Sequence, residues 1–205
     1  MDEAFSMFLE EFGPPIERRE VPTSSIQRYK GKLPDQLLAY WAEHGWAGYG
    51  EGIFWMVNPQ EYHGVVTSWL TGTELETIDN YHVIARSAFG DLYLWGEQTG
   101  ASLKITTILS RYTTHKSIYT GDKMDKGIRA FMASLRMDTN DYGELFIPAK
   151  KKLGPLLHDE MYGFTPALLL GAPDSLGHLE KVKAVEHLVF LAQLAPLSPY
   201  NFSDF

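Results

Sequence analysis

The feature that most constrains the fold is the segment at residues 88–97, which reads Ala-Phe-Gly-Asp-Leu-Tyr-Leu-Trp-Gly-Glu. On an extended chain Leu92 and Leu94 point to one side, whereas Tyr93 and Trp95 point to the other. Because both sides are large and apolar, a strand here is expected to be covered on both faces of a sheet. A single buried helix is the alternative, but the glycines at positions 90, 96 and 100 leave too little room for it.

A second strand is expected just upstream, at residues 82–86. Gly90 and Asp91 supply the turn between the two strands, since glycine adopts positive φ without steric cost. The two strands together predict a β-hairpin in the middle of a mixed sheet.

Helices are predicted along the chain on either side of this hairpin. Residues 2–12 carry apolar side chains at i, i+3, i+4 and i+7, and residues 33–45 have a proline in the first turn and a glycine at the end. Both patterns are typical of amphipathic helices. Further helices are expected at 58–70, 122–135, 144–153 and 181–195, and further strands at 53–57, 103–109 and 111–115.

The fold class predicted from these elements is α+β, with a mixed, largely antiparallel central sheet flanked by helices. The loop at residues 137–143 divides the chain into a domain at 1–137 and a smaller, mostly helical portion at 138–205. Residues 17–32 are polar and are expected to form a connector. The apolar run at 167–170 is expected to be buried, but it is too short to be assigned as strand or helix.

Cysteine is absent from the chain, which excludes disulfides, thiolate catalysis and thiolate zinc sites. The N-terminus lacks the basic residues of a signal peptide, and no apolar run approaches the length of about 20 residues that a membrane span needs. A cytoplasmic location without membrane contact is therefore expected.

The negative charge is concentrated in residues 33–103. This segment has one base, Arg86, against nine carboxylates, a difference equal to the whole formal net charge of −8. Such a segment repels nucleic acids and attracts a basic protein, so direct binding of DNA or RNA is not expected. A merely solubilising surface is the alternative. The nine carboxylates belong to Asp35, Glu43, Glu51, Glu61, Glu74, Glu76, Asp79, Asp91 and Glu97.

Residues 45–52 hold four glycines and two aromatic residues, and they are expected to form an exposed loop. The G-x-G-x-G spacing within it is compatible with a phosphate cradle. However, no lysine follows, and the surrounding charge is acidic. Nucleotide binding by this loop is therefore rejected.

No set of catalytic or metal-binding residues is recognisable. The seven histidines form no H-E-x-x-H pair, and the chain has neither a G-x-S-x-G elbow nor a G-x-x-x-x-G-K loop. His158, Asp159 and Glu160 are adjacent, but neighbours along one element do not converge on one ion. We expect a protein that is not an enzyme, with no catalytic residue, metal or cofactor.

Residues 153–168, with Gly171 and the segments 186–188 and 191–194, resemble the C-terminal domain of type VI secretion immunity proteins. Residues 1–15 and 88–96 are similar to the GAD-like domain that precedes it in those proteins. The helix start at 33–34 and the turn at 90–91 resemble features of the wider SUKH-type immunity superfamily. Gly171 is followed by Ala172 where a second glycine is expected, a departure that concerns only the local turn.

The resemblance implies a protein that protects a bacterium from its own antibacterial effector, often a DNase, by binding the toxin in the cytoplasm. The expected partner is thus a basic nuclease whose active site is occluded in a 1:1 complex. A SUKH-type adaptor with a different partner is one alternative, and an enzyme that closes residues 48–52 over a small ligand is another. The candidates for toxin binding are the solvated acidic loop positions and the aromatic loop, namely Glu51, Glu74, Glu76, Asp79, Glu97, Trp46 and Tyr49.

Overall fold

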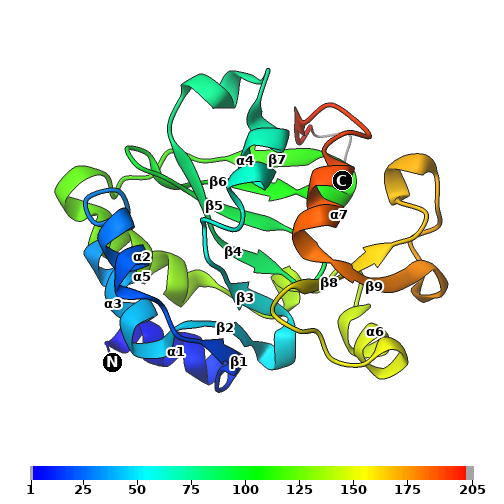
Figure 1. Cartoon of the computed structure of the whole chain (residues 1–205), viewed down its shortest axis with the longest axis horizontal. Coiled ribbons are helices and arrows are strands. Elements are labelled where there is room, and N and C mark those ends of the chain that lie inside the picture. The colour runs from blue at the N-terminus through cyan, green and yellow to red at the C-terminus, as the bar shows by residue number, and fades with distance from the viewer. Residues whose placement is uncertain (1, 202–205) are drawn as a thin grey trace.

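The computed structural model describes residues 2–201, and its centre is a sheet with the strand order β1-β2-β3-β4-β5-β6-β7-β10 (Figure 1). Neighbouring strands are antiparallel, except that β10 is parallel to β7. The predicted α+β fold with a mixed, largely antiparallel sheet is thus confirmed. The strands of this sheet are β1 (Ile16–Arg19), β2 (Trp46–Tyr49), β3 (Phe54–Met56), β4 (Tyr81–Ser87), β5 (Leu92–Gly96), β6 (Gly100–Thr106), β7 (Arg111–Thr114) and β10 (Ser198–Pro199).

The predicted hairpin is formed by β4 and β5 in the middle of this sheet. Leu92, Leu94 and Trp95 are buried, as expected for a strand covered on both faces. Gly90 has a φ of +89°, and a Cβ atom there would lie 2.6 Å from the methyl carbon of Met161. Glycine is therefore required both by the turn and by the C-terminal segment that packs over it.

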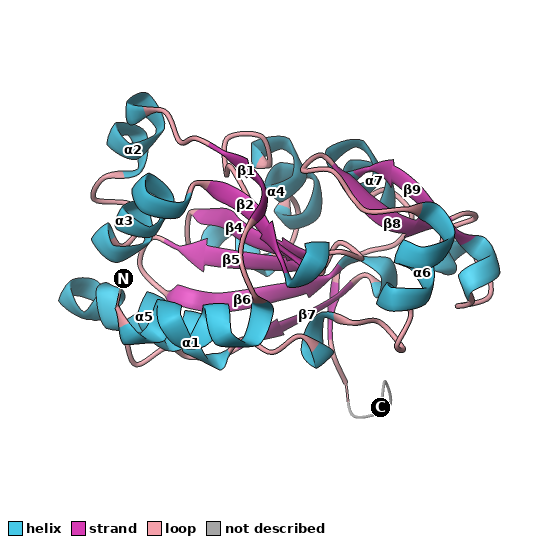
Figure 2. Ribbon diagram, turned by 90° about the horizontal axis from the view of Figure 1, so that it is seen from below, coloured by secondary structure: helices cyan, strands magenta, loops and turns pink. Residues whose placement is uncertain are grey.

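One layer of helices covers each side of the sheet. Figure 2 shows α1 and α5 below it and α4 and α7 above it. Tyr93 of β5 packs on Phe131 of α5 with a ring-centroid distance of 5.6 Å, and Phe8 of α1 packs on Phe54 of β3 at 5.7 Å. The helices are α1 (Glu3–Phe12), α2 (Thr23–Tyr29), α3 (Asp35–His44), α4 (His63–Leu70), α5 (Met124–Ser134), α6 (Phe146–Leu153) and α7 (Ala184–Leu191).

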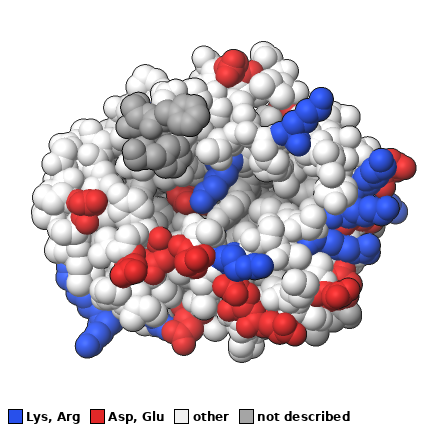
Figure 3. Space-filling view, turned by 180° about the vertical axis from the view of Figure 1, so that it is seen from behind, with Lys and Arg blue, Asp and Glu red and all other residues white. Residues whose placement is uncertain are grey.

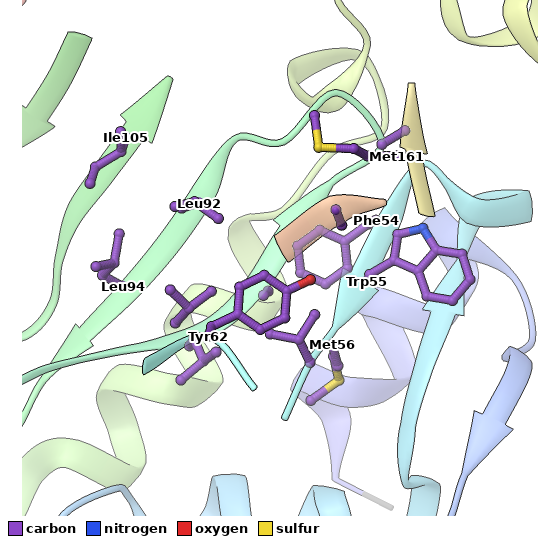
Figure 4. Close-up of a cluster of buried hydrophobic side chains, with 14 of the residues drawn as sticks. Phe54, Trp55, Met56, Tyr62, Leu92, Leu94, Ile105 and Met161 are labelled. Carbon is purple, nitrogen blue, oxygen red and sulfur yellow. The ribbon is translucent and has the colours of Figure 1, made fainter. Parts of the chain in front are cut away.

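The buried apolar side chains form one core that joins the main sheet to the C-terminal segment. Trp69 of α4 donates its indole N–H to the carbonyl of Leu188 in α7, at 3.1 Å. Figure 4 shows part of this core, where side chains from four strands meet beside Tyr62. The labelled strand residues there are Phe54, Trp55, Met56, Leu92, Leu94, Ile105 and Met161.

The C-terminal segment contains a second, two-stranded sheet of β8 (Glu160–Phe164) and β9 (Leu179–Lys183). Arg86 of β4 is fully buried, and its Nη2 donates to the carbonyls of His158 at 3.0 Å and Glu160 at 2.6 Å. The N–H of Tyr162 also bonds the carbonyl of Ala88, at 2.9 Å. These bonds hold β8 against the central hairpin.

The prediction that residues 45–52 form an exposed loop is wrong. Residues 46–49 are strand β2, and Trp46 and Tyr49 are only 4% and 0% exposed. A Cβ atom at Gly48 would lie 2.9 Å from the ring of Trp55 on the neighbouring strand. The glycine therefore permits close packing between strands, and it does not mark a flexible loop.

Other local expectations are corrected in the same way. The connector at 17–32 contains most of β1 and all of α2, and the last helix begins at Ala184 because residues 179–183 form β9. In the apolar run at 167–170, Ala167 is buried but Leu170 is 59% exposed. The division of the chain at residue 137 stays a prediction. In the described part of the chain, no helix is long and apolar enough to cross a membrane.

Candidate partner-binding surface

The loop before β4 and the turn after β5 are tied together by the carboxylate of Asp79. Asp79 Oδ2 accepts the backbone N–H groups of Gln98 at 2.9 Å and Thr99 at 2.7 Å. The N–H of Glu97 donates to the carbonyl of Asn80 at 3.1 Å. The structure thus brings Glu97 next to the loop that carries the other acidic candidates.

All five predicted acidic contacts have a hydrogen-bond partner within the chain, and Asp79 and Glu97 are the first two. Asp79 is engaged by backbone amides, so the expectation that its carboxylate is solvated is wrong. Glu97 has a side chain that is only 20% exposed, and its Oε1 lies 2.9 Å from Nε2 of His82. Asp79 therefore positions the loops, while Glu97 still borders the surface.

Glu74 and Glu76 lie on the exposed 3₁₀ turn at residues 74–77. Glu74 accepts a hydrogen bond of 2.9 Å from the hydroxyl of Tyr112. Burial, reinforced by this bond, raises the pKa of Tyr112. Glu76 accepts from the backbone N–H of Gly72 at 2.8 Å. Both carboxylates remain accessible to a partner.

Glu51 belongs to a different part of the surface. It lies between β2 and β3 with a φ of +59°, and its side chain is 70% exposed. Its carboxylate pairs with Lys150 of α6, and this hydrogen bond lowers the pKa of Glu51. Glu51 therefore extends toward the C-terminal segment, away from the loops joined by Asp79.

Glu97 lines a groove of about 390 Å³ together with three further carboxylates, and we call this the acidic groove. Its walls are the starts of α3 and α5, the segment 31–34 and the turn after β5. One cation, Lys32, also lines it. The four carboxylates are those of Asp35, Glu97, Asp122 and Asp125.

Asp122 and Asp125 were missed because they lie outside the acidic segment at 33–103. The sequence does predict a helix that begins near Gly121. It does not show that the first turn of this helix lies beside the first turn of α3, where the groove forms. Asp125 Oδ1 accepts the N–H of Gln36 at 2.9 Å, which fixes the two helix starts together. Within the described residues, the side chains of Asp35 and Asp122 are exposed and have no hydrogen-bond partner. These two carboxylates are therefore free to contact a partner.

Charge on the face seen in Figure 3 is mixed. Acidic side chains gather in several groups across its lower half, and basic ones gather along its right edge. On this face, the acidic side chains therefore form separate clusters and do not make a uniform negative surface.

The adjacent residues 158–160 have structural partners. Asp159 pairs with Lys183 at 2.5 Å, and this hydrogen bond lowers the pKa of Asp159. Glu160 pairs with Lys181 at 3.3 Å. In residues 2–201, no group of three or more His, Cys, Asp and Glu side chains is arranged to hold a metal ion.

Comparison with known proteins assigns both halves of the chain. Residues 3–109 match the GAD-like domain family, and residues 125–195 match the C-terminal domain of the type VI secretion immunity protein Tdi1. A search of curated protein sequences gives no match. The fold is similar to the crystal structure of Atu4351 from Agrobacterium tumefaciens, with a TM-score of 0.85 and 22% identity over 97% of this chain and 93% of that one.

Proposed function

This chain belongs to the GAD-like domain family and carries the C-terminal domain of a type VI secretion immunity protein, and from this premise we propose its function. We propose that it binds and neutralises a cognate effector nuclease in the cytoplasm. The proposed complex has one copy of each protein. Its effect is to occlude the active site of the effector, which is expected to be a DNase.

The acidic groove is the observation that supports a nuclease as the partner. The cleft of a nuclease is lined with Lys and Arg because it receives a polyanion. A surface with carboxylates at matching positions is attracted to such a cleft and is steered into it. Asp35 and Asp122 can approach a partner without breaking any hydrogen bond within the described residues.

The second contact region in this proposal is the exposed turn that carries Glu74 and Glu76. Asp79 holds that turn against the strand end that carries Glu97, which itself lines the acidic groove. The proposed partner is large enough to cover the groove and to extend to this turn. Glu51, which pairs with Lys150 in another part of the surface, is proposed only as a peripheral contact.

The test uses the effector encoded beside this protein, produced with an inactivating substitution. The association rate is measured at low and high salt for the wild-type protein and for the double variant Asp35→Asn/Asp122→Asn. We expect the variant to associate about tenfold more slowly at low salt, with a weaker dependence of the rate on salt. Light scattering of the purified complex measures the stoichiometry.

The matched control is Glu180→Gln, which removes a negative charge from an exposed position on β9. Its association rate should equal that of the wild-type protein. If the double variant also binds at the wild-type rate at low salt, the acidic groove lies outside the interface. If the wild-type protein binds no effector at all, a SUKH-type adaptor role replaces this proposal.

A further inference from the structure

A cavity of about 370 Å³ lies between α2, the start of α4 and the start of β4, and it differs in charge from the acidic groove. We call it the basic cavity. No carboxylate is among the residues that line it. Its polar lining is formed by Arg28, Tyr29, Lys32, Gln60, His63, Tyr81 and His82.

Two tyrosines at the base of this cavity lack a protein partner for their hydroxyl groups. Tyr29 and Tyr81 are only 5% and 7% exposed, and neither hydroxyl is hydrogen-bonded to any residue in the range 2–201. Burial raises the pKa of Tyr29, and the positive charge of Arg28 acts in the opposite direction. The guanidinium is thus close enough to favour a negative charge beside that hydroxyl. Neither hydroxyl is among the fully buried polar atoms, so each reaches the accessible surface and can donate a hydrogen bond to a ligand in the cavity.

The rim of the basic cavity carries two cations that have no ion pair within the described residues, Arg28 and Lys32. Several other basic side chains of this acidic protein do have a carboxylate partner, as in the pairs Arg19–Glu61 and Lys181–Glu160. Two unpaired cations beside one cavity produce a local positive potential. They match the charge of a dianion.

The first turn of α4 adds a favourable dipole, because His63 begins the helix at the wall of the cavity. Backbone N–H groups at a helix start stabilise an anion. His82 in the cavity wall is hydrogen-bonded to the carboxylate of Glu97, which lines the neighbouring acidic groove. The ring of Tyr29 meets that of His82 edge-on at 5.3 Å, which fixes the imidazole in the cavity wall.

We propose that the basic cavity binds the phosphate group of a small phosphorylated molecule. Arg28 and Lys32 neutralise its two charges, and the hydroxyls of Tyr29 and Tyr81 donate hydrogen bonds to its oxygens. The volume of about 370 Å³ leaves room for a sugar attached to the phosphate. This site is distinct from the acidic groove, although Lys32 lines both.

The experiment is a calorimetric titration of the whole protein with ribose 5-phosphate, inorganic phosphate and ribose, at constant ionic strength. We expect saturable 1:1 binding of the two phosphate-containing probes and no binding of ribose. Arg28→Gln and Lys32→Gln should each weaken binding of ribose 5-phosphate about tenfold, because each removes a charge-assisted hydrogen bond. Tyr29→Phe should weaken it several-fold while keeping the buried ring.

Lys151→Gln is the matched control, since it neutralises an exposed cation on α6, outside the cavity. It should bind ribose 5-phosphate as the wild-type protein does. The proposal is overturned by the absence of saturable phosphate binding, by equal weakening in the control, or by wild-type binding in both Arg28→Gln and Lys32→Gln. No effector is used, so failure here is distinct from failure of the immunity function.

Discussion

The carboxylate of Asp79 organises two loops at once. It accepts hydrogen bonds from the N–H groups of Gln98 and Thr99. It also accepts from the hydroxyl of Thr99 and from the N–H of Asn80, both at 2.7 Å. A Cβ atom at position 96 would collide with the same carboxylate, so Gly96 is required there. A residue that the sequence places on a solvated acidic loop is thus a structural element of the β5–β6 turn.

Replacing this carboxylate should therefore destabilise the fold. We expect Asp79→Ala to lower the free energy of unfolding by about 2–3 kcal/mol, since several hydrogen bonds to a charged group are lost together. Urea denaturation measures this change. Glu76→Ala, which removes a carboxylate with one backbone hydrogen bond from the same loop, should cost less than about 1 kcal/mol. Equal midpoints for the two variants would contradict the structural role of Asp79.

His187 is the residue whose protonation should affect stability most directly. Its Nε2 is buried without a hydrogen-bond partner in residues 2–201, and a Cβ atom at Gly163 would lie 2.8 Å from it. Burial lowers the pKa of His187, because the charged form would lose its hydration. The unfolded chain, with a histidine pKa of about 6.5, thus binds the proton more readily than the folded protein.

It follows that stability falls as the pH decreases from about 7 to 5. We expect His187→Gln to remove part of this decrease. Between pH 7 and pH 5, the free energy of unfolding should therefore fall less for the variant than for the wild-type protein. Thermal melts at several pH values measure it. His44, whose pKa is also lowered by burial, contributes equally to both proteins. Parallel pH curves would contradict the argument.

Among the elements, the hairpin β4–β5 could be predicted and several short strands could not. Alternating large apolar side chains over residues 92–95 are a local signal, and the structure confirms the strand. β1 and β10 have only four and two residues, too few for a period to be recognised. They exist because β2 and β7 offer unpaired edges, and that information lies in the tertiary structure.

The candidate surface could be predicted to a similar extent. Net charge pointed to Glu97 and to the exposed turn with Glu74 and Glu76, which lie as expected on loops. The same reasoning misread Trp46 and Tyr49, because glycine in a close-packed strand resembles glycine in a loop. The sequence reasoning also did not identify Asp122 as a candidate. The topology of the fold decides which helix starts lie together, and the sequence does not show it.

Arg86 connects the elements of the two halves, because it is a buried cation whose hydrogen bonds include the carbonyls that precede and begin β8. Arg86→Met should cost about 3 kcal/mol or more, since buried carbonyls lose their donors. Hydrogen exchange should be faster for the amides of β8 and β9 than for those of β6. Arg18→Met, at an exposed position, should change neither the stability nor the exchange rates. Unchanged exchange in β8 after Arg86→Met would show that this strand is held without the arginine, by apolar packing and by the backbone bond between Tyr162 and Ala88.

At the level of the whole molecule, the two matched family segments share one core. Met161 and Leu188 pack over Gly90, and Trp69 bonds α7. The predicted division at residue 137 therefore separates segments that stabilise each other.

A fragment of residues 138–205 should not fold alone, because its apolar surface and the carbonyls bound by Arg86 would face water. Circular dichroism should show no cooperative thermal transition for this fragment. Adding the fragment 1–137 should restore one if both remain soluble. A cooperative melt of 138–205 by itself would establish it as an independent domain.

The parallel strand β10 also sets an order of events during protein synthesis. β10 is the only strand in the described chain that pairs with the outer side of β7, and it is made long after β7 has left the ribosome. At about 5–20 residues per second, the nascent chain displays that edge for several seconds. An open edge recruits other strands, so this interval is when a newly made chain is most exposed to aggregation. The demand on chaperones should therefore depend on translation speed through residues 115–197, and slow codons there would lengthen the risk.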